Sequence, residues 1–349
     1  MKYNFTFRII IALFISSLFL FGCSKNSSNP APTPPNNLPT VTYTATVSTF
    51  AGGAKGGIQD GKGQNASFSG VWGIVMDESG NLYVSDYTTT LIRKITPDGT
   101  VSTFAGNTLN ENLQGQGGIS TDGKGSSASF AAPAGMTIDP SGNLFVADKN
   151  LIRKITPDGT VTTVINSKLV YDSNFLGITL DSDGNIYASD IGNDVILKIG
   201  QSGTSQVLAS GKNGATYLFG YPCGLHFGAA NNLYMVEGYG SNKIDRISSD
   251  GAVNLIAGTG YPGLTNGMGA KAAFFNPTGI STDLFGNIFV SDYGNKAIRQ
   301  ITTNGTVATL VVTNDLNSAS GPYDMVFDHS GKNIFLADGE FVLKITLEK

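Results

Sequence analysis

Acidic residues recur at one position of a repeated sequence, and carboxylates in such a pattern could bind a cation. Each lies at the end of a short apolar stretch: Asp86, Asp148, Asp190, Glu237, Asp292 and Asp338. Carboxylate oxygens are the ligands that hard cations such as Ca²⁺ prefer. A carboxylate can instead cap its own turn by accepting hydrogen bonds from backbone N–H groups. Because the acid recurs in every copy, we favour capping over a cation-binding ring.

One loop, residues 181–185, resembles the start of a calcium-binding loop through its sequence Asp-Ser-Asp-Gly-Asn. It lacks the bidentate glutamate that such loops carry farther on. The stretch also coincides with an ordinary turn of the third repeat. We therefore predict no metal site and no cofactor.

Histidine, the commonest general base, occurs only at His226 and His329. Two histidines cannot build a three-histidine zinc centre. His226 has Glu237 and Cys223 near it in sequence and could act as a base or a ligand, although a buried, hydrogen-bonded histidine is the commoner state. The sequence contains no Gly-x-Ser-x-Gly elbow and no visible Ser–His–Asp arrangement. We assign no catalytic residue and keep His226 and Glu237 as candidates for ligand binding.

Aromatic residues are the better lead for a binding site. They stand just before an inner strand or in a connection on one predicted face: Trp72, Tyr87, Tyr221, Tyr239, Tyr261, Tyr293 and Tyr323. Amphipathic rings in such places suit sugar rings, peptides or a protein partner. Ordinary packing at the base of loops is the competing interpretation for each ring. We expect Trp72 and Tyr323 to border the mouth of a channel.

The elements that must position these residues are short strands in six similar repeats. Residues 142–160 read as a strand, a tight turn, a second strand and a Pro-Asp-Gly turn, and residues 91–101 are repeated without change at 151–161. A period of roughly 40–60 residues built from short strands indicates a propeller with one four-stranded sheet per copy. The 45 glycines and the low charged fraction of 14% agree with an all-β fold rich in turns. We predict a six-bladed all-β propeller.

The two ends of the repeats predict how the ring closes. Residues 46–51 match a fourth strand but precede the first repeat, and the last repeat stops after its third strand at 341–346. We expect these two segments to pair, because closure removes exposed sheet edges. The innermost strands are predicted to start at Gly73, Gly135, Gly177, Gly224, Gly279 and Asp324.

Long insertions between repeats should lie on one face, which is then the candidate functional face. They comprise residues 52–69, 106–130, 210–220 and 258–276. Three of them share the pattern (Asp/Asn)-Gly-x-Gly-x-x-Ala-x-Phe, which ends at Phe68, Phe130 and Phe274. Neither a helix nor a Lys-Ser/Thr pair follows, so we predict that the glycines form turns and the phenylalanines plug the space between blades.

The repeated sequence motifs resemble those of NHL repeats, which form six-bladed propellers. They are Gly-x-x-x-Asp, Gly-Asn-(Leu/Ile)-(Tyr/Phe)-Val-(Ser/Ala)-Asp, Ile-Arg-Lys-Ile and the Pro-Asp-Gly turn, and the resemblance covers residues 46–349. The fourth repeat departs most, with Glu237 in place of the second Asp, and the sixth has Asp324 where the others have Gly. We expect these two blades to be the least regular.

The amino-terminal residues resemble the signal of a bacterial lipoprotein. Lys2 and Arg8 precede an apolar run over 9–21 that is short for a membrane span. Leu20-Phe21-Gly22-Cys23 resembles a lipobox, which implies cleavage before Cys23 and lipidation of its sulfur. We predict a signal peptide at 1–22, a lipidated cysteine with a Pro/Asn/Ser tether at 23–40, and a propeller at 41–349.

The whole chain resembles a bacterial NHL-repeat lipoprotein of the cell envelope, anchored on the periplasmic side or at the cell surface. Removing residues 1–22, with two basic and no acidic residues, changes the formal net charge from −4 to −6, which argues against nucleic acid as a partner. We expect a monomer that binds a protein or a glycan on the loop-rich face. The alternative is a lyase or hydrolase with its site at the channel mouth, as in some propellers that this chain resembles.

Overall fold

The computed structural model describes most of the chain after the amino-terminal segment. The described residues are 43–53, 55–108, 118–166, 173–213, 216–228, 231–312 and 320–348. The predictions for residues 1–22 and for the tether with Cys23 lie outside these ranges. Among the described residues, no helix is both long enough and apolar enough to cross a membrane.

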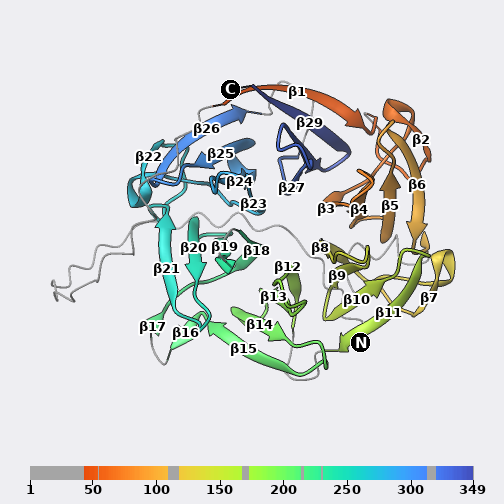
Figure 1. Cartoon of the computed structure of the whole chain (residues 1–349), viewed down its shortest axis with the longest axis horizontal. Helices are drawn as coiled ribbons and strands as arrows, with labels where there is room; N and C mark the ends of the chain where they lie inside the picture. The colour runs from red at the N-terminus through yellow and green to blue at the C-terminus, as the bar shows by residue number, and fades with distance from the viewer. Residues whose placement is uncertain are drawn as a thin grey trace, which may run out of the picture. The chain divides into compact units, whose positions relative to one another are not determined.

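Six antiparallel sheets surround a central axis and form the predicted propeller (Figure 1). Blade 1 contains β3 (Val71–Met76), β4 (Leu82–Asp86), β5 (Leu91–Ile95) and β6 (Thr100–Ala105); blade 2 contains β8 (Pro133–Ile138), β9 (Leu144–Asp148), β10 (Leu151–Ile155) and β11 (Thr160–Asn166); blade 3 contains β12 (Phe175–Leu180), β13 (Ile186–Asp190), β14 (Val195–Ile199) and β15 (Ser205–Ser210). Blade 4 contains β18 (Pro222–Phe227), β19 (Leu233–Glu237), β20 (Lys243–Ile247) and β21 (Val253–Ala257); blade 5 contains β23 (Ile280–Thr282), β24 (Ile288–Asp292), β25 (Ala297–Ile301) and β26 (Thr306–Val312); blade 6 contains β27 (Asp324–Phe327), β28 (Asn333–Asp338), β29 (Phe341–Glu348) and β1 (Thr44–Ala51).

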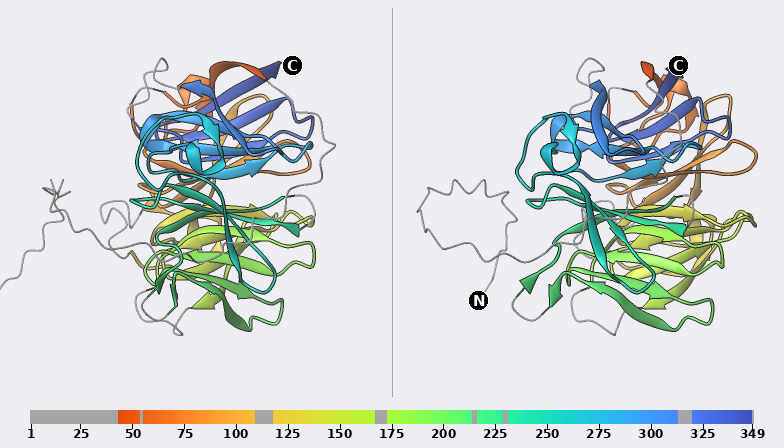
Figure 2. Two further views of the ribbon diagram at one scale, coloured as in Figure 1. Left: turned by 90° about the vertical axis from the view of Figure 1, so that its left-hand side faces the viewer. Right: turned by 60° about the vertical axis from the view of Figure 1, so that its left-hand side comes forward.

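The ring closes as predicted, through pairing of β1 with β29. The pairing is antiparallel, and Val47 lies opposite Ile345. The first and last described strands therefore lie side by side in blade 6, where Figure 1 draws them together. Side views show strands crossing the ring and turns at its two faces (Figure 2). We call the face with the second-to-third connections of each blade the mouth face, and the other the opposite face.

Three blades carry a fifth strand at the outer edge, which the sequence did not predict. The added strands are β2 (Gly61–Lys62), β7 (Gly123–Lys124) and β22 (Gly267–Met268), and they pair with β6, β11 and β26. Each is followed by a short 3-10 helix: η1 (Gly63–Asn65), η3 (Gly125–Ser127) or η5 (Gly269–Lys271). A further 3-10 helix, η6 (Tyr293–Asn295), follows β24. The sheet edge in these blades is thus covered by the chain's own backbone.

The expectation that all long insertions stay on one face is wrong for these three blades. The N–H of Gly63 donates to the carbonyl oxygen of Gly99 at 2.9 Å, and Gly125 bonds Gly159 in the same way. Gly99 and Gly159 belong to the third-to-fourth turns, which lie on the opposite face. Each insertion therefore runs along the outer edge of its blade to the opposite face and returns. Gly63 has a φ of +56°, which a side chain would disfavour.

The phenylalanines that end the insertions fill the junctions between blades, as predicted. Phe68, Phe130 and Phe274 are fully buried. Phe68 packs in one cluster with Val342 of blade 6 and Val84 of blade 1. The spacing that the three insertions share therefore places a buried phenylalanine at the inner side of each five-stranded blade's insertion, against the neighbouring blade.

The inner strands approach closely because five of the six carry a glycine at the same place. A Cβ on Gly73 would lie 2.5 Å from the carbonyl oxygen of Ala134 on the next inner strand, and one on Gly279 would lie 2.6 Å from that of Tyr323. In blade 6 this position is Asp324, whose carboxylate accepts the N–H of Ile74 at 3.3 Å. Five glycines and one aspartate therefore set the width of the channel.

We predict that Gly73→Ala lowers the free energy of unfolding by about 1–3 kcal/mol, because the added methyl group meets backbone that is held by two neighbouring strands. The measurement is the urea midpoint followed by circular dichroism. Gly200→Ala is the matched control, since the nearest atom to its Cβ would be 3.8 Å away. Equal midpoints for the two variants would contradict a packing role for the glycine.

Candidate functional site

The repeated carboxylates do cap backbone N–H groups, but mostly not those of their own turns. Asp148 accepts the N–H groups of Ala131 and Ala132 at 2.8 and 2.7 Å. Equivalent bonds join residues 16 or 17 apart in other blades: Ser69 N to Asp86, Asn174 N to Asp190, Gly220 N to Glu237 and Phe275 N to Asp292. Asp190 also caps its own turn, through the N–H of Gly192 at 3.0 Å. The carboxylates thus hold the segment that leads into the inner strand.

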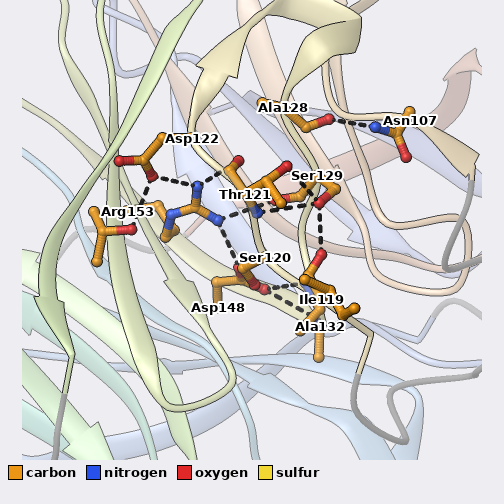
Figure 3. Close-up of polar contacts among 12 residues, drawn as sticks. Asn107, Ile119, Ser120, Thr121, Asp122, Ala128, Ser129, Ala132, Asp148 and Arg153 are labelled. Atoms are coloured by element: carbon orange, nitrogen blue, oxygen red, sulfur yellow. Dashed lines mark hydrogen bonds and ion pairs between the residues drawn. The ribbon is translucent and has the colours of Figure 1, made fainter.

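In three blades a buried arginine lies against this segment. Arg153 donates through Nη1 to the Ser129 carbonyl oxygen at 3.0 Å and to Asp148 at 3.2 Å (Figure 3). Its Nη2 donates to the Thr121 carbonyl oxygen at 2.9 Å and to Asp122 at 3.0 Å. The guanidinium carbon lies 5.3 Å from the centre of the Phe130 ring that it covers.

Arg93 and Arg299 occupy the same place over Phe68 and Phe274 in blades 1 and 5. In these blades the cation beside the carboxylate is therefore the chain's own guanidinium. No group of three His, Cys, Asp or Glu side chains suited to a metal ion occurs among the described residues. The Asp181 loop is an ordinary turn in which Asp181 accepts the N–H groups of Asp183 and Asn185.

Four of the predicted aromatic residues meet in one cluster on the mouth face. Trp72 stacks on Tyr323 with ring centres 4.4 Å apart and lies 5.6 Å from Tyr87. The Tyr323 ring lies 4.8 Å from Tyr293, and the two hydroxyl groups are 3.4 Å apart. All four side chains are half-buried. The prediction was that Trp72 and Tyr323 border the mouth of a channel; the contact between their two rings was not predicted.

A second aromatic pair extends the cluster across blade 4. Tyr221 and Tyr239 lie 4.9 Å apart and are 40% and 48% exposed. Burial, with smaller contributions from Cys223 and Tyr293, raises the pKa of Tyr239 to about 12. Tyr261 is 78% exposed and makes none of these ring contacts.

We call these six residues the aromatic mouth: Trp72, Tyr87, Tyr221, Tyr239, Tyr293 and Tyr323. They come from blades 1, 4, 5 and 6. The rings remain neutral at physiological pH, and they offer both apolar faces and hydroxyl groups. Such a surface can stack on sugars or hold apolar side chains.

Beneath the mouth lies a channel cavity of about 230 Å³ between the inner strands. Trp72 and Tyr323 line it together with His226 and Asp324. Burial lowers the pKa of His226 to about 4, and its Nε2 lies 3.1 Å from the Thr282 hydroxyl. Burial raises the pKa of Asp324 to about 7. The cavity is smaller than the roughly 300–1,000 Å³ typical of ligand pockets, so a larger ligand would remain at the mouth.

Glu237, the other predicted polar site residue, lies outside the aromatic mouth. It is buried in blade 4 beside Asp245, a residue that the sequence analysis did not single out. Burial, then a hydrogen bond and charge from Glu237, raises the pKa of Asp245 well above its usual value. The signal available in the sequence was the loss of the arginine of Ile-Arg-Lys-Ile from the third strand of this repeat.

Comparisons with known proteins identify the domain and the fold. The family described as the teneurin NHL domain matches residues 116–328, more than half of the chain. Teneurin-3 of Danio rerio is 25% identical over 307 residues, which cover 81% of this chain and 10% of teneurin-3. The chain thus spans about a tenth of the length of this curated relative.

Two solved propellers illustrate the range of proteins with this fold. An auxiliary nutrient binding protein from Bacteroides thetaiotaomicron is 16% identical, with a TM-score of 0.68, over 88% of this chain and 78% of its own. A gluconolactonase from Xanthomonas campestris is 14% identical, with a TM-score of 0.64, over 93% of this chain and 99% of its own. At these identities the likeness establishes the fold alone.

We predict that Arg153→Met lowers the free energy of unfolding by about 3–5 kcal/mol, because it leaves Asp148 buried without its cation. The matched control is Lys124→Met in the same insertion, which removes an ion pair to Asp158 between side chains that are 65% and 57% exposed. That control should cost less than about 1 kcal/mol. Urea denaturation measures both, and a similar cost for the two would contradict a special role for the buried pair.

Proposed function

Because the chain belongs to the teneurin NHL domain family, we propose that it is a binding module that holds a protein or glycan ligand at the aromatic mouth. The observation that carries this proposal is the presence, at the mouth of a narrow channel, of four rings in contact and a further pair of tyrosines, contributed by four blades. Exposed aromatic side chains held by a rigid scaffold present large contact areas at low entropic cost. The nutrient-binding neighbour is compatible with such a role, although it shares only the fold.

The rival function, a lyase or hydrolase at the channel mouth, has less support from the side chains. Catalysis of that kind needs acids and bases that converge on one point. The described residues lining the cavity include one histidine, His226, and one carboxylate, Asp324. His226 is neutral at physiological pH and already lies beside the Thr282 hydroxyl. Binding is therefore the function that these groups favour.

We predict that a ligand seated at the mouth changes the fluorescence of Trp72, the only tryptophan in the chain. The protein is titrated with two panels, glycans and envelope peptides, and the panel that saturates distinguishes the two ligand classes. Tyr323→Ala should weaken the affinity by about tenfold or more, as expected for an aromatic hot spot.

Tyr261→Ala is the matched control, because Tyr261 is an exposed tyrosine outside the mouth. It should leave the affinity unchanged. If neither panel produces a saturable change while circular dichroism reports an intact fold, binding of these ligands at the mouth is ruled out.

We further propose that the protein is a lipoprotein of the bacterial cell envelope, held at the membrane through Cys23. The support comes from the sequence: a basic start, an apolar run over 9–21, the lipobox-like residues 20–23, and a proline-rich tether. A tether of this composition would hold the propeller away from the membrane surface, and the mouth would be free to meet its ligand.

Expression in a bacterial host with labelled palmitate tests the anchor. We expect Cys23→Ser to lose the label and to move the protein from the membrane to the soluble fraction. Cys223→Ser removes the only other cysteine and should keep both the label and the membrane location. Label that persists in Cys23→Ser would refute lipidation at this residue.

A further inference from the structure

Blade 4 lacks the guanidinium that blades 1, 2 and 5 hold beside the second-strand carboxylate. Arg93 lies opposite Val84 in the pairing of the second and third strands, and Arg153 lies opposite Val146. At the same register of blade 4, Asp245 lies opposite Met235. A carboxyl group thus occupies the place where three other blades have a cation.

The framework around this place is otherwise preserved. The N–H of Gly220 donates to Glu237 at 3.0 Å, just as that of Ala131 donates to Asp148. Phe219 stands three residues before its inner strand, as Phe130 does, and is 3% exposed. Blade 4 therefore keeps the carboxylate and the buried ring that surround the guanidinium elsewhere, but it has neither the guanidinium nor the fifth strand of the insertion among its described residues.

The two carboxyl groups of blade 4 are incompletely satisfied. Glu237 and Asp245 are 1% and 3% exposed and lie within hydrogen-bonding reach of each other. Glu237 Oε1 and Asp245 Oδ2 are buried and have no hydrogen-bond partner other than this contact between two acids. Two adjacent buried carboxylates cannot both ionise unless a cation joins them, and otherwise they must share a proton.

One acid of this pair, Glu237, lines a cleft of about 270 Å³ together with Phe219 and Lys243. Asp245 is not among the residues that line it. In blade 4 the insertion forms a separate hairpin of β16 (Lys212–Asn213) and β17 (Thr216–Tyr217), and among the described residues no fifth strand covers the outer edge. Tyr217 also lines the cleft and is 73% exposed. In blades 1, 2 and 5 a fifth strand covers this edge, whereas in blade 4 the cleft reaches the nearly buried Glu237.

We propose that this cleft, lined by Phe219, Glu237 and Lys243 and with Asp245 next to Glu237, binds the guanidinium of an arginine side chain on a peptide or protein partner. The other blades supply the precedent within the same chain. Around Arg153, two carboxylates, two backbone carbonyl oxygens and an aromatic ring receive the planar cation. Arginine suits such a site because its forked donors match carboxylates and its plane stacks on aromatic rings.

Two other charged groups lie near the cleft. Lys243 on β20 lines it and its charge acts on Asp245, but it forms no ion pair with either acid within 4.0 Å among the described contacts, so its ammonium does not fill the site. Asp194, in the connection after β13, accepts the N–H of Tyr221 at 2.9 Å and adds a negative charge nearby. This site is distinct from the aromatic mouth, so it does not depend on the function proposed for the mouth.

Calorimetric titration of the purified protein with the peptide acetyl-Gly-Arg-Gly-amide tests the proposal. The control peptide carries citrulline, which keeps the shape of arginine but is uncharged. We expect the arginine peptide to bind about tenfold tighter or more, since its hydrogen bonds are assisted by charge. Equal affinity for the two peptides would overturn the proposal, and so would Ca²⁺ that displaces the arginine peptide at lower concentration.

Variants then locate the binding. Asp245→Arg should rebuild the internal guanidinium, abolish binding of the arginine peptide and raise the urea midpoint. Asp245→Asn should weaken binding about tenfold, while the new side-chain amide can still donate a hydrogen bond to Glu237. Glu237→Gln gives the same test if the first variant fails to fold. Tyr323→Ala at the aromatic mouth should not change the affinity. Binding that survives Asp245→Arg, or that is lost in Tyr323→Ala, would refute the assignment to blade 4.

Discussion

The arrangement of the mouth depends on a buried carboxylate that, in five of the blades, holds the segment leading into the inner strand. Burying a carboxylate is costly unless donors surround it. In blade 2 the cost is offset by two backbone N–H groups and by Arg153, which also binds the insertion. In blade 3, where Leu197 takes the place of the arginine, Asp190 instead accepts the N–H groups of Asn174 and Gly192 and the side-chain amide of Asn193. The contact between the second-strand carboxylate and the segment before the inner strand is thus kept in both blades, although different donors surround the carboxylate.

This contact matters for binding because two aromatic residues of the mouth, Trp72 and Tyr221, follow segments that it holds. Trp72 comes three residues after Ser69, whose N–H donates to Asp86. Tyr221 comes directly after Gly220, whose N–H donates to Glu237. The rings are therefore carried on backbone that is fixed at both ends, by a carboxylate before the inner strand and by sheet pairing within it. A surface fixed in this way binds without a large loss of conformational entropy.

The departures from regular repetition gather in blade 4, and they have a common physical basis. Replacing Arg by Asp245 removes a cation that neutralises the acid of the second strand, and the insertion no longer has a guanidinium to bind. The insertion of blade 4 accordingly forms its own hairpin rather than a fifth strand. The replacement of arginine by aspartate thus accompanies both a cleft at Glu237 and a buried pair of acids. Functional sites are expected at positions where one repeat departs from the residues that the other repeats share.

The sequence alone determined the number of blades, their strands and the closure of the ring, because strand alternation and turn residues act locally and recur six times. It also indicated that Phe68, Phe130 and Phe274 are buried and that Tyr323 stands before an inner strand, whereas Trp72, predicted at the same place, lies within β3. It could not indicate that the insertions cross the outer edge, since the glycine pattern is compatible with any tight turn. Nor could it indicate the partners of the carboxylates, which lie 16 or 17 residues away.

Only the closed ring decided which side chains meet. Trp72 and Tyr323 are far apart in sequence yet stack at 4.4 Å, and Ile74 donates its N–H to Asp324 across the same junction. Asp245 and Glu237 become a pair because β19 and β20 align them, and their charge is unusual only in comparison with the arginines of the other blades. Contacts between blades depend on how the ring closes, and no local pattern in the chain encodes them.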